Sequence, residues 1–174
     1  MSQYTPTTGV ITQINWQNID PDQLGCSLLI SFRSMDQGDI QMVVDGSTYV
    51  VDNRQLKVGD QVTFFYSLFA PVPLIYPPQY RAVAAVHTPS GQYATLDVFT
   101  QVPYNSQLTN SDDTLRLNLS RRISLTLPNG QVFGGALSGK LLLVLYGATT
   151  RSIPAQTTPE RIIVFCGQEQ NRAA

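Results

Sequence analysis

Charged side chains are scarce in this chain, and their scarcity argues against several classes of function. Asp, Glu, Lys and Arg make up 13% of the 174 residues, about half the usual share of roughly 25%. Lysine occurs only as Lys57 and Lys140, and the net charge is −1. So weak a field does not steer polyanions or anionic membranes to the protein. Neutral polar side chains must keep it soluble, which favours association with itself or with a partner.

Residues that ligate metals or act as catalytic bases are also few. The chain has one histidine, His87, and two cysteines, Cys26 and Cys166, which cannot supply four zinc ligands at a familiar spacing. Asp20–Gly25 starts like a calcium loop, but Leu24 stands where an oxygen ligand is required. The chain contains no Walker A or GxGxxG motif. We therefore predict no metal, no cofactor and no enzymatic activity.

The cysteines leave two questions open. Cys26 and His87 belong to the same half of the chain, so a Cys–His pair is an alternative to a surface histidine at a strand end. Neither cysteine lies in a CxxC motif, and we expect two buried free thiols rather than a disulfide. The sequence alone does not decide whether Cys26 and Cys166 are free.

Long hydrophobic runs are absent. The longest, Leu141–Tyr146, is far shorter than the roughly 20 residues of a membrane span, so we expect a buried strand and no membrane insertion. The segment Met1–Pro6 has neither the basic nor the apolar region of a signal peptide. These features predict a cytoplasmic protein. The cell or spore surface is the alternative, because the polar, lysine-poor composition suits it as well.

Helical periodicity is missing too, whereas strand signals are dense. Segments such as 10–16 and 62–66 are rich in β-branched and aromatic residues. Asp45–Gly46 and Asn129–Gly130 each separate two such segments, which predicts two hairpins. Leucines alternate with polar residues over 115–119, so Arg116 and Asn118 should share a solvent face.

The second half of the chain repeats the first. Three landmarks recur at a constant shift of 80 residues: Gly59 and Gly139, Tyr66 and Tyr146, and Arg81 and Arg161. The repeat predicts two similar β modules, residues 1–89 and 90–174, joined by a short linker. One pseudo-symmetric barrel is the alternative.

About five short strands in each module fit a small Greek-key barrel. The segment Leu56–Val62, with the sequence LKVGDQV, is similar to the turn that enters a late barrel strand in many OB-fold (oligonucleotide/oligosaccharide-binding) domains. The resemblance implies an all-β chain of two tandem small Greek-key (OB-like) β-barrels. An antiparallel sandwich with a glycine turn is the alternative.

A second resemblance covers about 15 residues near the C-terminus. The segment Tyr146–Pro159 contains Tyr-Gly followed by TRSIPAQ, and it is similar to segments in β modules of uncharacterised proteins from Gram-positive bacteria. The resemblance implies a bacterial structural or interaction module. It carries over no catalytic residue.

The connection over residues 67–79 is apolar, aromatic, rich in proline and free of charge. It either covers its own barrel or packs on the second module, or it forms a contact surface for a protein. The corresponding segment 147–159 is polar and carries an arginine, which indicates a role specific to the first module. The predicted binding residues are Phe69, Leu74, Ile75, Tyr76 and Arg151.

These observations predict a non-catalytic structural or protein-interaction module that binds a protein partner or itself as a homo-oligomer. A carbohydrate-binding module is the alternative, because aromatic rings and neutral amides suit sugars. Single-stranded nucleic acid is the second alternative. The sequence disfavours it, because the first module has few cations to follow a phosphate backbone: Arg33, Arg54, Lys57 and Arg81.

Overall fold

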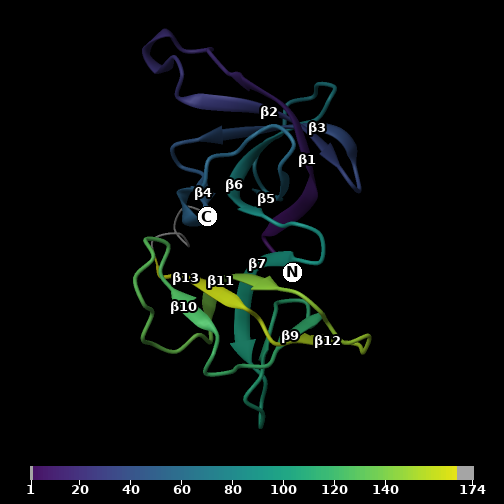
Figure 1. The fold of residues 1–174 in the computed structure, drawn as a ribbon, viewed down its shortest axis with the longest axis vertical. Helices are drawn as coiled ribbons and strands as arrows, with labels where there is room; N and C mark the ends of the chain where they lie inside the picture. Colours follow the sequence, from purple (N-terminus) through teal and green to yellow (C-terminus); the bar gives the residue numbers. More distant parts are fainter. Residues whose placement is uncertain (1, 168–174) are drawn as a thin grey trace. The chain divides into compact units, whose positions relative to one another are not determined.

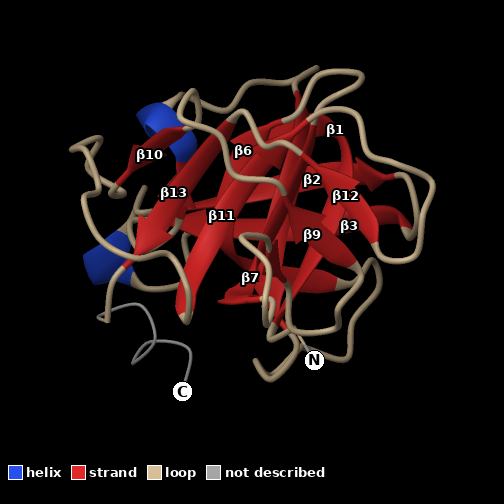
Figure 2. Cartoon of the chain, turned by 90° about the horizontal axis from the view of Figure 1, so that it is seen from below, coloured by secondary structure: helices blue, strands red, loops and turns tan. Residues whose placement is uncertain are grey.

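The computed structural model describes residues 2–167 and consists almost entirely of strands and loops (Figure 2). Residues Thr5–Pro89 form one compact unit, the first unit. Within the described residues, the second unit comprises residues 2–4 and 90–167. The described helical segments are two short 3-10 turns: η1 (Pro21–Gln23) and η2 (Val51–Asn53). The all-β prediction is confirmed.

The first unit is a closed barrel of five strands in mixed orientation. Six strands are labelled in Figure 1: β1 (Tyr4–Trp16), β2 (Ser27–Ser34), β3 (Gly38–Asp45), β4 (Tyr49–Val50), β5 (Gln61–Ser67) and β6 (Gln79–His87). Neighbours follow the order β3-β2-β1-β5-β6, and β3 also pairs with β6 in parallel, which closes the ring. Apolar side chains fill the interior, among them Phe32 and Phe64, whose rings meet edge to face at 5.0 Å.

A glycine turn leads into β5, at the segment that suggested a barrel. The backbone N–H of Asp60 donates to the carbonyl of Lys57 at 3.1 Å. Gly59 has φ of +92°, the left-handed conformation that the third residue of a type II turn requires. Gly139 repeats this turn before β11 with φ of +84°, and the N–H of Lys140 donates to the carbonyl of Leu137.

The hairpin predicted at Asp45–Gly46 is wrong. The turn itself forms, since the N–H of Thr48 donates to the carbonyl of Asp45 at 3.1 Å. The strand that follows, β4, pairs in parallel with β6 and not with β3. Both β3 and β4 pair with β6, β3 near its start and β4 further along. The turn therefore connects β3 and β4, which both pair with β6.

The second unit is an open sheet, so the prediction of two barrels is wrong: only the first unit closes. Its strands are β7 (Tyr93–Gln101), β8 (Leu108–Thr109), β9 (Leu115–Leu117), β10 (Ser124–Thr126), β11 (Lys140–Tyr146), β12 (Ala155–Thr157) and β13 (Arg161–Phe165). They follow the order β10-β13-β11-β7-β8-β9-β12. The edge strands β10 and β12 do not pair with each other.

A break in one strand explains why the second sheet stays open. In the first unit, the continuous strand β6 pairs with both β3 and β5. In the second unit these roles are divided, because β12 pairs with β9 and β13 pairs with β11. Between β12 and β13 stands Pro159, which has no N–H to donate to a sheet. At the corresponding place β6 has only a bulge, where Phe65 pairs with Ala84 and Tyr66 with Ala82.

The pairing also corrects one landmark of the repeat. Phe65 pairs with Ala84, and its counterpart Leu145 pairs with Arg161. Arg161 therefore corresponds to Ala84, and its alignment with Arg81 is three residues out. The connection before β12 is three residues shorter than the connection before β6. The shift of 80 residues therefore no longer holds beyond these connections, although it happens to match Arg81 with Arg161.

Two local predictions in the second unit are confirmed. Leu115 and Leu117 are buried, whereas Arg116 and Asn118 are partly exposed on the other face of β9. Asn129–Gly130 forms a hairpin in which the N–H of Leu127 donates to the carbonyl of Gln131 at 2.7 Å. Gly130, with φ of +86°, supplies the left-handed residue of that turn.

Candidate functional site

The four residues predicted to bind in the first unit lie on the connection between β5 and β6. Their side chains are exposed: Leu74 fully, Tyr76 by 89%, Phe69 by 70% and Ile75 by 52%. Leu68 and Val72 are exposed on the same connection, at 48% and 42%. We call these six side chains the apolar loop. They do not plug the barrel, and their role in binding stays a prediction.

Arg151 lies on the corresponding connection between β11 and β12 and is exposed. It makes no hydrogen bond or ion pair with the described part of the chain. Sequence reasoning missed its neighbour Ile153, which is 99% exposed. Ile153 precedes the cis proline Pro154 as Tyr76 precedes the cis proline Pro77. The corrected register would have revealed this second exposed apolar side chain.

Two half-buried tyrosines lie at the strands that flank the apolar loop. The rings of Tyr66 on β5 and Tyr80 on β6 are stacked, with centroids 4.2 Å apart. The Gln37 side chain joins them, because its Nε2 donates to the Tyr66 hydroxyl at 3.1 Å and its Oε1 accepts from the Tyr80 hydroxyl at 2.9 Å. Burial raises the pKa of Tyr66. The base of the loop is thus a fixed aromatic pair on rigid strands.

The structure does not assemble the Cys–His alternative. The Nε2 atom of His87 lies 2.8 Å from Oδ2 of Asp60. The thiol of Cys26 donates weakly to the carbonyl of Leu24 at 3.9 Å. Cys26 and Cys166 are both free and exposed, so the expectation of buried thiols is wrong. Cys26 follows the turn at Gly25 and Cys166 follows the last strand, where the chain leaves the sheet.

The acidic turn at Asp20–Gly25 has a local structural role. The Asp20 carboxylate accepts the N–H of Asp22 at 3.0 Å and caps the short turn η1. Among residues 2–167, no three His, Cys, Asp or Glu side chains come together as metal ligands. No helix in this part of the chain is long and apolar enough to cross a membrane.

The carboxyl of Asp60 makes the stability of the first unit depend on pH. Burial opposes the charged form, but hydrogen bonds with His87 and the Lys57 backbone outweigh it and lower the pKa of Asp60 below 3.8. Such a group stabilises the fold above its unfolded pKa, and this contribution is lost as the pH falls through the folded pKa. We expect Asp60→Asn to be less stable than the wild type at about pH 6 and closer to it at about pH 3. Urea unfolding at the two pH values measures both differences, and an equal difference at both would contradict the prediction.

Comparison with known proteins gave no match: no family model, no curated protein and no solved structure is significantly similar to this chain.

Proposed function

We propose that this protein is a non-catalytic interaction module and that the apolar loop of its first unit is the contact surface. The observation that carries the proposal is the exposure of six apolar side chains on one uncharged connection. Exposed apolar surface of this kind costs solubility, and where it is contiguous it marks interaction sites. Prolines stiffen the connection, so ordering it in a complex costs less entropy.

The place of the loop in the barrel supports this proposal. The five-stranded closed barrel favours an OB-like first unit. The apolar loop joins β5 to β6, the fourth and fifth strands of that barrel. In OB-folds this loop is one of the two that bind ligands. A shared fold does not fix a shared ligand, so the chemistry of the side chains decides the class of partner.

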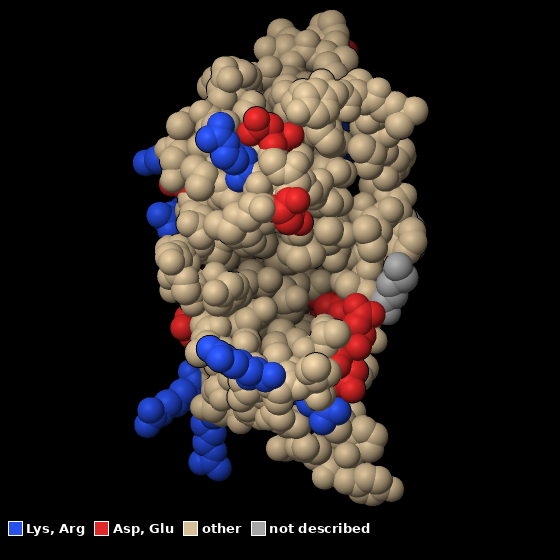
Figure 3. Space-filling view, turned by 90° about the vertical axis from the view of Figure 1, so that its right-hand side faces the viewer, with Lys and Arg blue, Asp and Glu red and all other residues tan. Residues whose placement is uncertain are grey.

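The partner that fits best is a second copy of this chain. The loop carries no charge and the chain's net charge is only −1, so two copies meet without strong repulsion. Charged side chains occupy small, separate parts of the face shown in Figure 3. Two aromatic and four aliphatic side chains expose several hundred Å² of apolar surface, comparable to the roughly 800 Å² that each partner contributes to a standard interface.

Charge within the first unit speaks against a nucleic-acid partner. Arg33 forms an ion pair with Asp39 at 3.4 Å, and Arg81 is paired with Asp45. Two of the four cations of this unit therefore already have a carboxylate partner within the unit. Nucleic-acid binding at physiological salt depends on several free cations that displace counterions from phosphates.

Light scattering of the wild type and of Phe69→Asp/Tyr76→Asp tests the proposal. We expect the wild type to show twice the monomer mass at about 100 μM, a concentration at which a micromolar complex is populated. The variant should be a folded monomer, because each carboxylate would be buried without a partner in the dimer. Weakening of the complex should exceed about 100-fold.

The matched control changes two other exposed apolar residues of the first unit, Ile19 at 80% and Leu24 at 62%. Ile19→Asp/Leu24→Asp should keep the mass of the wild type. A wild type that is monomeric at this concentration would overturn self-association. A dimer that survives in Phe69→Asp/Tyr76→Asp would place the contact elsewhere on the chain.

A further inference from the structure

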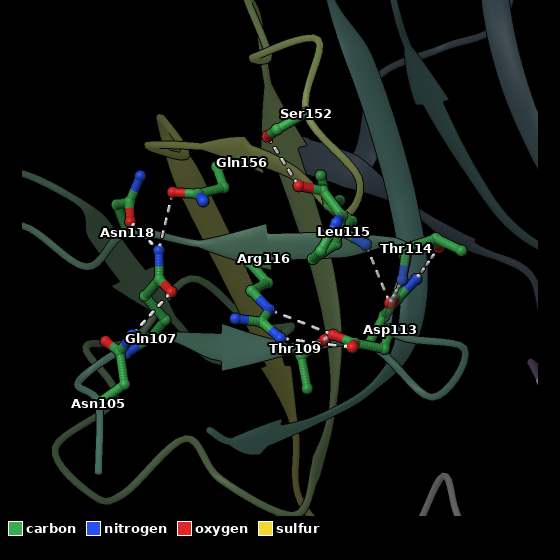
Figure 4. A network of polar contacts seen from close by, with 12 residues as sticks. Asn105, Gln107, Thr109, Asp113, Thr114, Leu115, Arg116, Asn118, Ser152 and Gln156 are labelled. Carbon is green, nitrogen blue, oxygen red and sulfur yellow. Dashed lines mark hydrogen bonds and ion pairs between the residues drawn. The ribbon is translucent and has the colours of Figure 1, made fainter. Parts of the chain in front are cut away.

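One outer face of the second unit is lined with amide side chains. It is formed by β8, β9, β12 and the residues that flank them, and Figure 4 shows it from close by. The strands turn their apolar residues inward, since Leu108, Leu115 and Leu117 are buried. The polar residues between them face outward. We call the following set the amide face: Asn105, Gln107, Arg116, Asn118 and Gln156.

Gln107 lies at the centre of the amide face and holds its neighbours in place. Its Nε2 donates to Oδ1 of Asn118 at 2.6 Å and to Oε1 of Gln156 at 3.0 Å. Its Oε1 accepts from Nδ2 of Asn105 at 3.0 Å (Figure 4). Three hydrogen bonds from three segments therefore fix the planes of four carboxamides before any ligand binds, which lowers the entropy lost on binding.

The network leaves hydrogen-bonding capacity unused. Both side-chain N–H groups of Gln107 donate to the amide oxygens of Asn118 and Gln156. The amide nitrogens of Asn118 and Gln156 have no partner within residues 2–167. Each carries two N–H donors, and each lies on the opposite side of its carboxamide from the oxygen that faces Gln107. Fixed donors with no protein partner are a feature of sites that orient a polar ligand.

The one cation of the amide face is already neutralised. Nε of Arg116 lies 3.2 Å from Oδ1 of Asp113, and the carboxylate also accepts from the Thr109 hydroxyl at 2.6 Å. An anionic ligand would have to compete with Asp113 for this guanidinium. The amide face therefore suits an uncharged ligand with many hydroxyl groups, which both donate and accept hydrogen bonds.

The repeat shows that the fold does not require these amides. Gln107 and Asn118 lie one residue beyond the pair Leu108 and Leu117 of β8 and β9. The pair in the first unit that corresponds to Gln107 and Asn118 is Leu29 and Val43. The first residue of β6 and the second residue of β12 correspond to each other, and both are glutamine: Gln79 and Gln156. Because an apolar pair occupies the positions of Gln107 and Asn118 in the first unit, pairing of the corresponding strands does not require amides there.

An exposed tyrosine directly precedes one residue of the amide face in the sequence. Tyr104 immediately precedes Asn105 on the connection between β7 and β8, and its side chain is fully exposed. A tyrosine presents an apolar ring face together with a polar hydroxyl. Such a ring can pack against the C–H face of a sugar while amides bind the hydroxyls at its edge.

We propose that the amide face binds a neutral oligosaccharide, with Asn118 and Gln156 donating to its hydroxyls and Tyr104 packing on its ring. The site lies wholly in the second unit, so it is independent of the apolar loop. Glucose-, mannose-, xylose- and N-acetylglucosamine-based hexasaccharides are the probes. Titration of the full chain by NMR should shift the side-chain NH2 signals of Asn118 and Gln156. We expect a dissociation constant of about 0.1–1 mM for at least one probe.

The decisive variant replaces Gln107 and Asn118 with leucine and valine, the residue types found at the corresponding positions of the first unit. Gln107→Leu/Asn118→Val should keep the fold, because the same pair stands in the first barrel, and should weaken binding at least tenfold. The matched control, Gln41→Leu/Gln79→Leu, removes two amides from the first unit and should leave the affinity unchanged. Should the decisive variant fail to fold, Tyr104→Ala serves in its place and should weaken binding at least threefold.

Two results would overturn the proposal. One is the absence of any side-chain NH2 shift with all four hexasaccharides at about 10 mM, tenfold above the weakest expected dissociation constant. The other is a folded Gln107→Leu/Asn118→Val variant that binds as tightly as the wild type. A change in the mass of the protein has no bearing on either result, so this test is separate from that of self-association.

Discussion

Gly9→Ala should destabilise the first unit by more than about 3 kcal/mol, near the upper end of overpacking effects. A Cβ at residue 9 would lie 2.0 Å from the carbonyl oxygen of Arg33 and 2.9 Å from Cα of Ser34. Both atoms belong to the backbone of β2, so no side chain can rotate away. Relief requires β1 and β2 to separate where Gly9 pairs with Ser34, and this pair is part of the closed ring.

Urea unfolding followed by tryptophan fluorescence measures this effect, because Trp16 on β1 is the chain's one tryptophan. Gly46→Ala is the matched control. A Cβ there would meet no atom within 4 Å, and Gly46 does not have the positive φ that penalises alanine. Its stability should stay within about 1 kcal/mol of the wild type. Equal effects of the two substitutions would show that β1 and β2 do not approach as closely as described.

Phe99→Ala should cost the second unit about 3–5 kcal/mol. The Phe99 ring on β7 is fully buried and belongs to the apolar cluster with Leu117, Leu142 and Ile162. Its loss leaves a cavity between strands that are already short, since β8 and β9 have two and three residues.

The exposed Tyr104 provides the control for Phe99. Tyr104→Ala removes an aromatic ring of similar size from the same unit, and the free energy of unfolding should change by less than about 0.5 kcal/mol. Urea unfolding by circular dichroism, with amide hydrogen exchange on β11 and β13, assigns the loss to the second unit. A Phe99→Ala variant as stable as Tyr104→Ala would contradict the description of this core.

The local features of the fold could be read from the residues. Gly59 and Gly139 each need a positive φ, and each precedes a strand of consecutive apolar residues, so the repeat of turn and strand was predictable. The alternation around Arg116 placed Arg116 and Asn118 on one face, because successive residues of a strand point to opposite sides. The exposed loop at Phe69 drew attention through its composition alone.

The candidate site in the second unit could not be found in this way. Gln156 is far from Gln107 and Asn118 in the sequence, and all three occur among many other amides. They come together because β9 pairs with both β8 and β12. Ile153 was missed because its equivalence to Tyr76 follows from strand pairing and not from matching residue types.

The residues alone were enough to predict the all-β class and the turns at Gly59 and Asn129–Gly130. Both depend on residues that lie within a few positions of one another in the chain. Closure of the first unit and the open sheet of the second are properties of the tertiary structure. Closure requires hydrogen bonds between residues about 40 positions apart, such as Gln41 and Gln79. Pro159 has no N–H, and at this residue the strand that corresponds to β6 is divided into β12 and β13. The second sheet therefore stays open although the sequences of the two units have similar local patterns.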